Sequence, residues 1–117
     1  TPNCPNIFDE VPVDCIGSVF EDKGSRLGAR RSFISEVQRA WGDIGWTSGY
    51  TNAGVFVLSK EHSNIFDSVD GNYWLGNGSA DVHMAYQANK LGHKIHELSY
   101  RWNHMRRCEA TLRCLKF

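Results

Sequence analysis

The chain has 117 residues, enough for one domain with a moderate core, and 41% of them are hydrophobic and 22% charged, as in soluble globular proteins. Its 13 Lys and Arg side chains balance 13 Asp and Glu, so the overall charge gives no reason to expect a nucleic-acid partner. No apolar run approaches the roughly 20 residues of a membrane span and no signal peptide is recognisable, so we expect a cytoplasmic protein without a membrane span.

The first third of the chain predicts a strand followed by a helix. Residues 5–11 fit one short helical turn, and residues 13–20 alternate imperfectly between polar and apolar, as a strand does, with Gly17 as a candidate bulge. In residues 32–41 the apolar positions recur every three or four residues, which indicates an amphipathic helix. Ser32 is the N-cap that this pattern predicts.

The stretch that organises the rest of the chain is residues 50–58, Y-T-N-A-G-V-F-V-L. Residues 53–58 form a short, almost continuous apolar run, which is typical of a strand covered on both faces, and we expect this strand at the centre of the sheet. Gly54 indicates that another backbone or a ligand comes close there. Asn52 is the polar side chain nearest the start of the strand, where it would either cap a turn or hydrogen-bond a ligand.

The second half of the chain predicts two further helices and a strand. Residues 60–69 fit a short helix, and residues 70–78, rich in glycine and asparagine, predict a mobile loop that carries Trp74. Residues 79–91 form the clearest helix, and residues 94–98 alternate as a strand. Because strands and helices alternate along the chain, the sequence predicts an α/β or α+β fold with a helix-covered sheet.

One carboxylate stands at the start of the clearest helix. Ser79 is the expected cap, and Asp81 lies in the first turn, where the helix dipole favours a negative charge by a few tenths to about 1 kcal/mol without any ligand. A carboxylate and an amide also suit sugar hydroxyls, and an indole face suits the apolar side of a pyranose. We therefore expect Asn52 and Asp81 at one end of the sheet, beside a cleft that Trp74 overhangs.

Histidine and cysteine spacings give weak signals. His93 and His96 are spaced H-x-x-H across a helix-to-strand junction, which turns the two rings in different directions, so we expect polar edge histidines and no metal site in this chain. The cysteines could form two disulfides in an oxidising compartment or pack as reduced thiols, and we interpret them as mostly reduced. They are Cys4, Cys15, Cys108 and Cys114.

Three blocks together resemble, in order, the C-terminal half of nucleotide-diphospho-sugar glycosyltransferases of the GT-A fold. They are P-N-C-P-N-I-F-D-E-V-P (residues 2–12), Y-T-N-A-G-V-F-V-L-S-K (50–60) and S-A-D-V-H-M-A-Y-Q-A-N-K-L-G-H-K-I-H-E-L-S-Y-R-W-N-H-M (79–105). The type they resemble is the retaining, family-eight-like group that includes glycogenin and bacterial lipopolysaccharide galactosyltransferases. The resemblance implies a partial GT-A-like mixed sheet flanked by helices.

The resemblance also implies which residues contact the substrate. Asn52, Ala53 and Gly54 match the strand that lines the sugar end of the donor site in the family. Asp81 falls at the helix start where the family places sugar and acceptor contacts, and we take it as the catalytic candidate. Trp74, on the neighbouring loop, is a further substrate-binding candidate from the residues themselves.

The sequence departs from the family in two respects. Ala80 and Val82 flank Asp81, where the family has a glutamine beside the aspartate. No D-x-D pair is present to hold Mn²⁺ or Mg²⁺ against the diphosphate, so the resemblance implies a divalent cation only for a full-length enzyme and no cofactor in this chain. Residues 101–103, R-W-N, match a closing motif of the family that is mainly structural.

We therefore expect the sugar-side and acceptor-side part of a glycosyltransferase that moves a sugar from a nucleotide-diphosphate donor to an acceptor. In this interpretation residues 1–117 are one domain, a fragment of a larger one, and inactive alone. The alternative is a stand-alone carbohydrate-binding or structural module that kept the fold and lost the chemistry. A truncated sheet would leave an edge that another copy covers, which predicts a homo-oligomer. The donor nucleotide, the sugar, the acceptor and the stereochemistry stay open.

Overall fold

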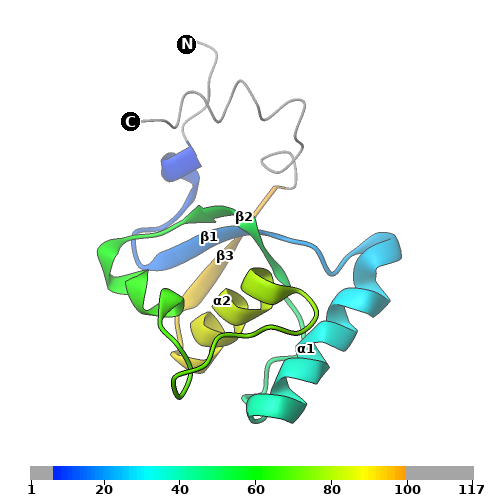
Figure 1. Ribbon diagram of the computed structural model, residues 1–117. Coiled ribbons are helices and arrows are strands. Elements are labelled where there is room, and N and C mark those ends of the chain that lie inside the picture. Colours follow the sequence, from blue (N-terminus) through cyan, green and yellow to red (C-terminus); the bar gives the residue numbers. More distant parts are fainter. Residues whose placement is uncertain (1–6, 100–117) are drawn as a thin grey trace.

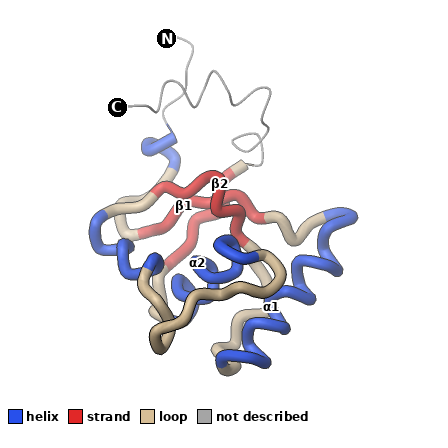
Figure 2. Tube along the Cα trace, viewed as in Figure 1, coloured by secondary structure: helices blue, strands red, loops and turns tan. Residues whose placement is uncertain are grey.

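The computed structural model describes residues 7–99, which form a mixed α/β fold (Figures 1 and 2). Residues 101–103 and three of the cysteines, Cys4, Cys108 and Cys114, lie outside this range, whereas Cys15 is a free thiol. The elements, in chain order, are η1 (Ile7–Glu10), β1 (Cys15–Phe20), η2 (Gly24–Arg26), α1 (Leu27–Trp41), β2 (Thr51–Val57), η3 (Lys60–Phe66), α2 (Ser79–Lys90) and β3 (Lys94–Leu98), where η denotes a 3₁₀ helix.

The sheet of the described residues has three strands in the order β2-β1-β3, with β1 antiparallel to β2 and parallel to β3. The expectation that residues 53–58 lie at the centre is therefore wrong: β1 is central, and β2 is an edge strand. An apolar run indicates that both faces of a strand are covered, but it does not indicate whether the strand is central or at the edge of the sheet. Val55 and Val57 pack on one face of the sheet and Phe56 packs on the other, and neither contact requires a second neighbouring strand.

Different residues pack against the two faces of the sheet. Ile16 packs against Ile65 of η3 and Ala88 of α2, while Val19 packs on the opposite face with Val11, which follows η1. Gly17 makes the second contact possible, because a Cβ at this position would lie 2.5 Å from Val11 Cγ2. The candidate bulge at Gly17 is therefore wrong, since the irregularity between β1 and β2 lies further along β1.

Helix α1 packs beside α2, which crosses in front of the sheet in Figure 1. Helix α1 begins at Leu27, five residues before the expected start, so Ser32 lies inside the helix and is not its N-cap. The 3₁₀ helix η2 leads directly into α1, and no side chain caps the start of α1. At the start of α2 the N-cap is Gly78, with φ of 84°, and not Ser79. A side chain at Gly78 would collide with the Tyr50 hydroxyl, so the cap position admits only glycine without rearrangement.

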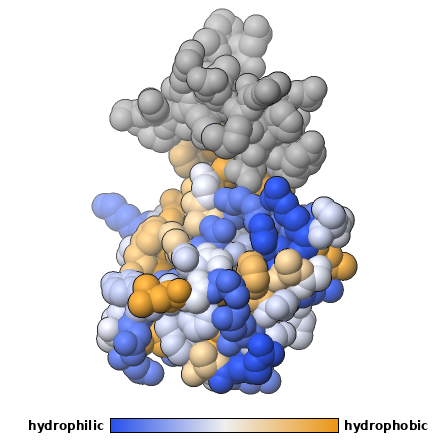
Figure 3. Space-filling view, turned by 45° about the vertical axis from the view of Figure 1, so that its right-hand side comes forward, coloured by the Kyte–Doolittle hydropathy of each residue, from blue (hydrophilic) through white to orange (hydrophobic). Residues whose placement is uncertain are grey.

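The surface mixes strongly hydrophilic with hydrophobic residues on the same face (Figure 3). Two large exposed side chains, Tyr73 and Leu75, come from the loop between η3 and α2, whereas Trp74 between them is half-buried. This loop presents more apolar surface than a polar linker would. Within residues 7–99 no helix has both the length and the apolar character needed to cross a membrane.

Candidate functional site

The N-A-G stretch of β2 bulges away from β1. Thr51 pairs with Phe20 and Phe56 pairs with Ser18, so the four residues of β2 between these pairs (52–55) lie opposite a single residue of β1, Val19. The Ser18 hydroxyl lies 3.2 Å from the carbonyl oxygen of Asn52 and 3.1 Å from that of Val55, and it fills the opening. The bulge turns main-chain groups of the stretch away from the sheet ladder and toward other partners.

Asp81 is the partner of this bulge. Its Oδ1 accepts a hydrogen bond of 2.7 Å from the Ala53 amide, and the nearby Tyr50 hydroxyl also lowers the pKa of this carboxyl group. Burial raises the pKa of Asp81, and nearby Glu21 raises it further, against the lowering effect of the Ala53 amide and Arg30. Asp81 is therefore more than a charge that complements the helix dipole, because it joins α2 to the bulged strand.

Glu21 connects Asn52 to this arrangement. One carboxylate oxygen accepts a hydrogen bond from Asn52 Nδ2, and the other lies 3.0 Å from Nε of Arg30. Asn52 Oδ1 in turn accepts from the Gly54 amide at 2.6 Å. The structure thus brings Asn52, Ala53, Gly54 and Asp81 together at one end of the sheet, and it also shows that Asn52 supports the turn within the bulge.

Asp22, the next residue, fixes the approach to β2 and is almost fully buried. Its carboxylate accepts hydrogen bonds from the Gly49 and Tyr50 amides at 2.9 and 3.0 Å and from Arg31 Nε at 3.1 Å. Burial alone would raise its pKa, but these hydrogen bonds together hold the pKa below its ordinary value of 3.8. Sequence reasoning missed Glu21 and Asp22, although an acidic pair directly after a buried strand was the available signal.

A crevice of about 670 Å³ lies at the carboxyl ends of the parallel strands β1 and β3, and Glu21 is among its lining residues, whereas Asn52 and Asp81 are not. Its walls include Phe20, Glu21 and Arg26. An ion pair between Lys23, which precedes η2, and Glu97 of β3 also lies in the wall. Crevices at the carboxyl ends of parallel strands commonly bind ligands. Because the cations are paired with carboxylates, the crevice offers both hydrogen-bond donors and acceptors without a strong net charge.

The structure does not bring Trp74 to this crevice. Its ring packs edge-on against Trp41, with centroids 5.3 Å apart, and its Nε1 donates to the Asn77 carbonyl at 2.9 Å. Trp74 instead lines a separate small pocket on α2.

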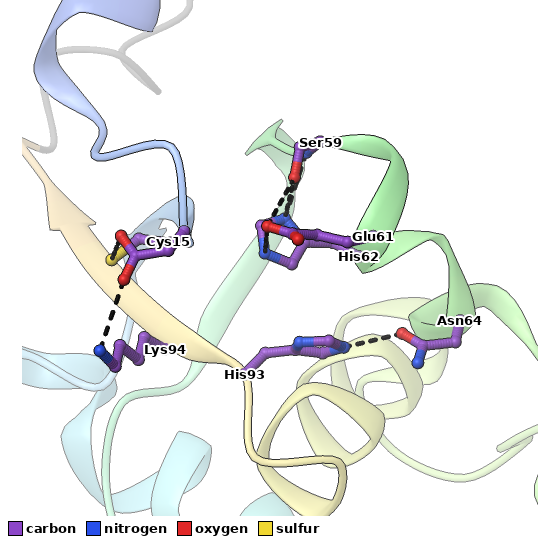
Figure 4. A network of polar contacts seen from close by, with 8 residues as sticks. Cys15, Ser59, Glu61, His62, Asn64, His93 and Lys94 are labelled. Atoms are coloured by element: carbon purple, nitrogen blue, oxygen red, sulfur yellow. Dashed lines mark hydrogen bonds and ion pairs between the residues drawn. The ribbon is translucent and has the colours of Figure 1, made fainter.

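A second polar cluster lies at the other end of the sheet (Figure 4). His62 Nδ1 accepts a hydrogen bond from the Ser59 amide at 3.1 Å, and His93 Nε2 is bonded to Asn64 Oδ1 at 2.7 Å. These contacts cap η3 and tie it to the start of β3, so they have a structural role. Within residues 7–99 no group of three or more His, Cys, Asp and Glu side chains is arranged to hold a metal ion.

Comparison of the chain with protein-family models, curated proteins and solved structures found no match. The likeness to glycosyltransferases therefore rests on the sequence blocks alone, and any functional conclusion must come from the chemistry of the Asp81 cluster, by which we mean Glu21, Asp22, Arg30, Tyr50, Asn52 and Asp81.

Proposed function

We propose that the crevice and the Asp81 cluster bind a hexopyranose, and that the chain supplies the sugar-side and acceptor-side part of a nucleotide-sugar glycosyltransferase. The observation that carries this proposal is that Asn52 and Asp81 lie close to Glu21, which itself lines the crevice at the carboxyl ends of β1 and β3. Asn52 lies in β2, Asp81 in α2 and Glu21 directly after β1, so the three groups are up to 60 residues apart in the sequence.

The chemistry of the crevice suits a neutral sugar better than an isolated phosphate. Each sugar hydroxyl both donates and accepts, and the pairs Lys23–Glu97 and Arg26–Glu21 present donors next to acceptors. Phe20 adds an apolar ring to the wall, which suits the C–H face of a pyranose. A phosphate would need cations that are not already neutralised by carboxylates.

Asp81 has the role of catalytic candidate in this proposal. Glycosyl transfer develops positive charge at the anomeric carbon, and a fixed, half-buried carboxylate stabilises such a charge more strongly than one in water. The Ala53 amide holds the carboxylate in place before substrate binds.

Departure of a nucleoside diphosphate needs stabilisation of negative charge as well. In the family that the sequence resembles, a D-x-D pair holds the divalent cation, and no such pair occurs in these 117 residues. We therefore propose that the chain binds the sugar but does not transfer it alone. A D-x-D strand elsewhere in the intact enzyme would complete the reaction.

The test is a titration of the ¹⁵N-labelled chain with the methyl glycosides of glucose, galactose, mannose and N-acetylglucosamine. The proposal predicts saturable amide shifts for at least one sugar, centred on residues 20–26, 50–54 and 79–82. Saturable shifts centred instead on the second polar cluster (Ser59, His62, Asn64 and His93), or no shifts with any sugar, would refute it.

A further inference from the structure

The small pocket lined by Trp74 is a distinct feature that the proposed function does not use. About 210 Å³ in volume, it lies between the end of η3, the loop before α2, and α2 itself. Ala80, His83 and Met84, at helical spacing, share one face of α2, whereas Asp81 points to Ala53. We call this feature the aromatic pocket, and its lining residues are Phe66, Tyr73, Trp74, Ala80, His83 and Met84.

The nitrogen atoms in the walls are occupied by contacts within the chain. His83 Nδ1 accepts from the Trp74 amide at 3.1 Å, which leaves Nε2 to donate to the Asp67 carbonyl at 2.8 Å. Trp74 Nε1 donates to Asn77. The Tyr73 hydroxyl is the one further N–H or O–H group on the six side chains, so a ligand inside the pocket meets mainly carbon and sulfur.

The walls are also held in position before any ligand arrives. Trp41 packs edge-on against both Trp74 and His83, with ring centroids 5.3 and 5.6 Å apart. The centroids of the Tyr73 and His83 rings lie 5.0 Å apart. Two of the aromatic walls nevertheless face water, since Phe66 is 48% exposed and Tyr73 is 57% exposed. Folding alone leaves this apolar surface uncovered, which is a feature of ligand sites.

We propose that the aromatic pocket binds one uncharged planar aromatic ring, single or fused, carried by a small molecule. A cavity of about 150 Å³ with apolar walls accepts benzene, so the volume here admits one ring system and little more. Aromatic walls prefer the edge and face of another aromatic ring, and the Met84 sulfur adds a favourable contact with a ring edge. A sugar would lose hydrogen bonds to water there without replacing them, so this ligand differs from that of the crevice.

The test uses indole as the probe, with cyclohexanol and methyl glucoside as aliphatic and polar comparisons. Titration of the ¹⁵N-labelled chain with indole should give saturable shifts at residues 66, 73, 74, 80, 83 and 84, with low-millimolar affinity. Cyclohexanol should bind more weakly, and methyl glucoside should leave these amides unmoved. Equal binding of cyclohexanol, or no saturable response to indole, would overturn the proposal.

Two variants locate the binding and keep the test independent of the crevice. Ala80→Leu plugs the pocket from an exposed helical position and should abolish the indole response, whereas Ala40→Leu, the same change on α1, should preserve it. Tyr73→Ser removes a wall from a loop and should weaken binding without unfolding the helix. An unchanged response in both pocket variants would refute the site. A tryptophan-containing tripeptide that binds much more tightly than indole would reassign the pocket to a protein partner.

Discussion

The carboxylate of Asp81 accepts a hydrogen bond of 2.7 Å from the main-chain amide of Ala53, which joins the first turn of α2 to the bulge of β2. A bulged strand loses ladder partners, and this carboxylate replaces one of them. The same bond places Asp81 next to Asn52, so one contact accounts both for the local fold and for the candidate site.

Replacing Asp81 by Asn should make the protein more stable near neutral pH. Because the folded pKa of Asp81 is raised, the stability that it contributes is fully present below its ordinary value of 3.8 and is lost as pH rises through the folded value. Asn keeps an oxygen for the Ala53 amide and carries no charge. Urea unfolding should therefore show a gain near pH 7 that disappears near pH 3. A variant that is less stable than the wild type near pH 7 would contradict this account.

Asp22→Ala should destabilise the protein by roughly 2–4 kcal/mol, because it leaves the buried Tyr50 amide, the partly buried Gly49 amide and Arg31 without their acceptor. The pKa of Asp22 is lowered, so its contribution is present above 3.8 and is lost as pH falls through the folded value. The loss measured by urea unfolding should be largest near neutral pH and shrink in acid. Asp9→Ala, on an exposed carboxylate, is the control and should cost little; a comparable cost there would show that the effect is not local.

Gly78→Ala should cost about 2–4 kcal/mol, because φ is +84° and the added Cβ would lie 2.3 Å from Val82 Cγ2 and 2.5 Å from the Tyr50 hydroxyl oxygen. Gly28→Ala is the matched control. Gly28 lies in α1 with open space around it, so the same substitution should stabilise by about 0.5–1 kcal/mol. Thermal unfolding of the two variants should give shifts of opposite sign, and shifts of the same sign would disprove the assignment.

Self-association is expected at high protein concentration. Among residues 7–99, β2 has no neighbouring strand on its outer side, and Leu27, Tyr73 and Leu75 expose large apolar side chains. Sedimentation equilibrium should show a mass that rises with concentration toward a dimer. A monomeric mass throughout the concentration range would exclude the homo-oligomer.

Most element positions could be predicted from local patterns, whereas the order of the strands could not. The bounds of β3 and the start of α2 followed from periodicity and flanking glycines. The central position of β1 depends on long-range pairing, which a two-sided apolar run does not encode. Asp22 was missed for a similar reason, since its partners, Gly49 and Tyr50, are more than 25 residues away.

Part of the site was accessible from the sequence because Asn52 and Asp81 each stand next to a turn or a helix start. Their connection through Glu21 and Ala53 required the bulge, whose register no local pattern predicts. Trp74 was assigned to the cleft from its place on a glycine-rich loop, but its packing on Trp41 turns it to another pocket. Loop proximity in sequence does not determine which cavity a side chain lines.

The most direct test of the account is calorimetric titration of the chain with UDP- and GDP-sugars and Mn²⁺, together with an assay of nucleotide release. We predict weak binding, in the low-millimolar range, that falls at least about fivefold in Asp81→Asn and in Asn52→Ala, as expected for the loss of one hydrogen bond or charge contact. Asp9→Asn should bind as the wild type does, and no variant should release nucleotide above background. An affinity that is unchanged in both Asp81→Asn and Asn52→Ala, or turnover by the isolated chain, would contradict the account.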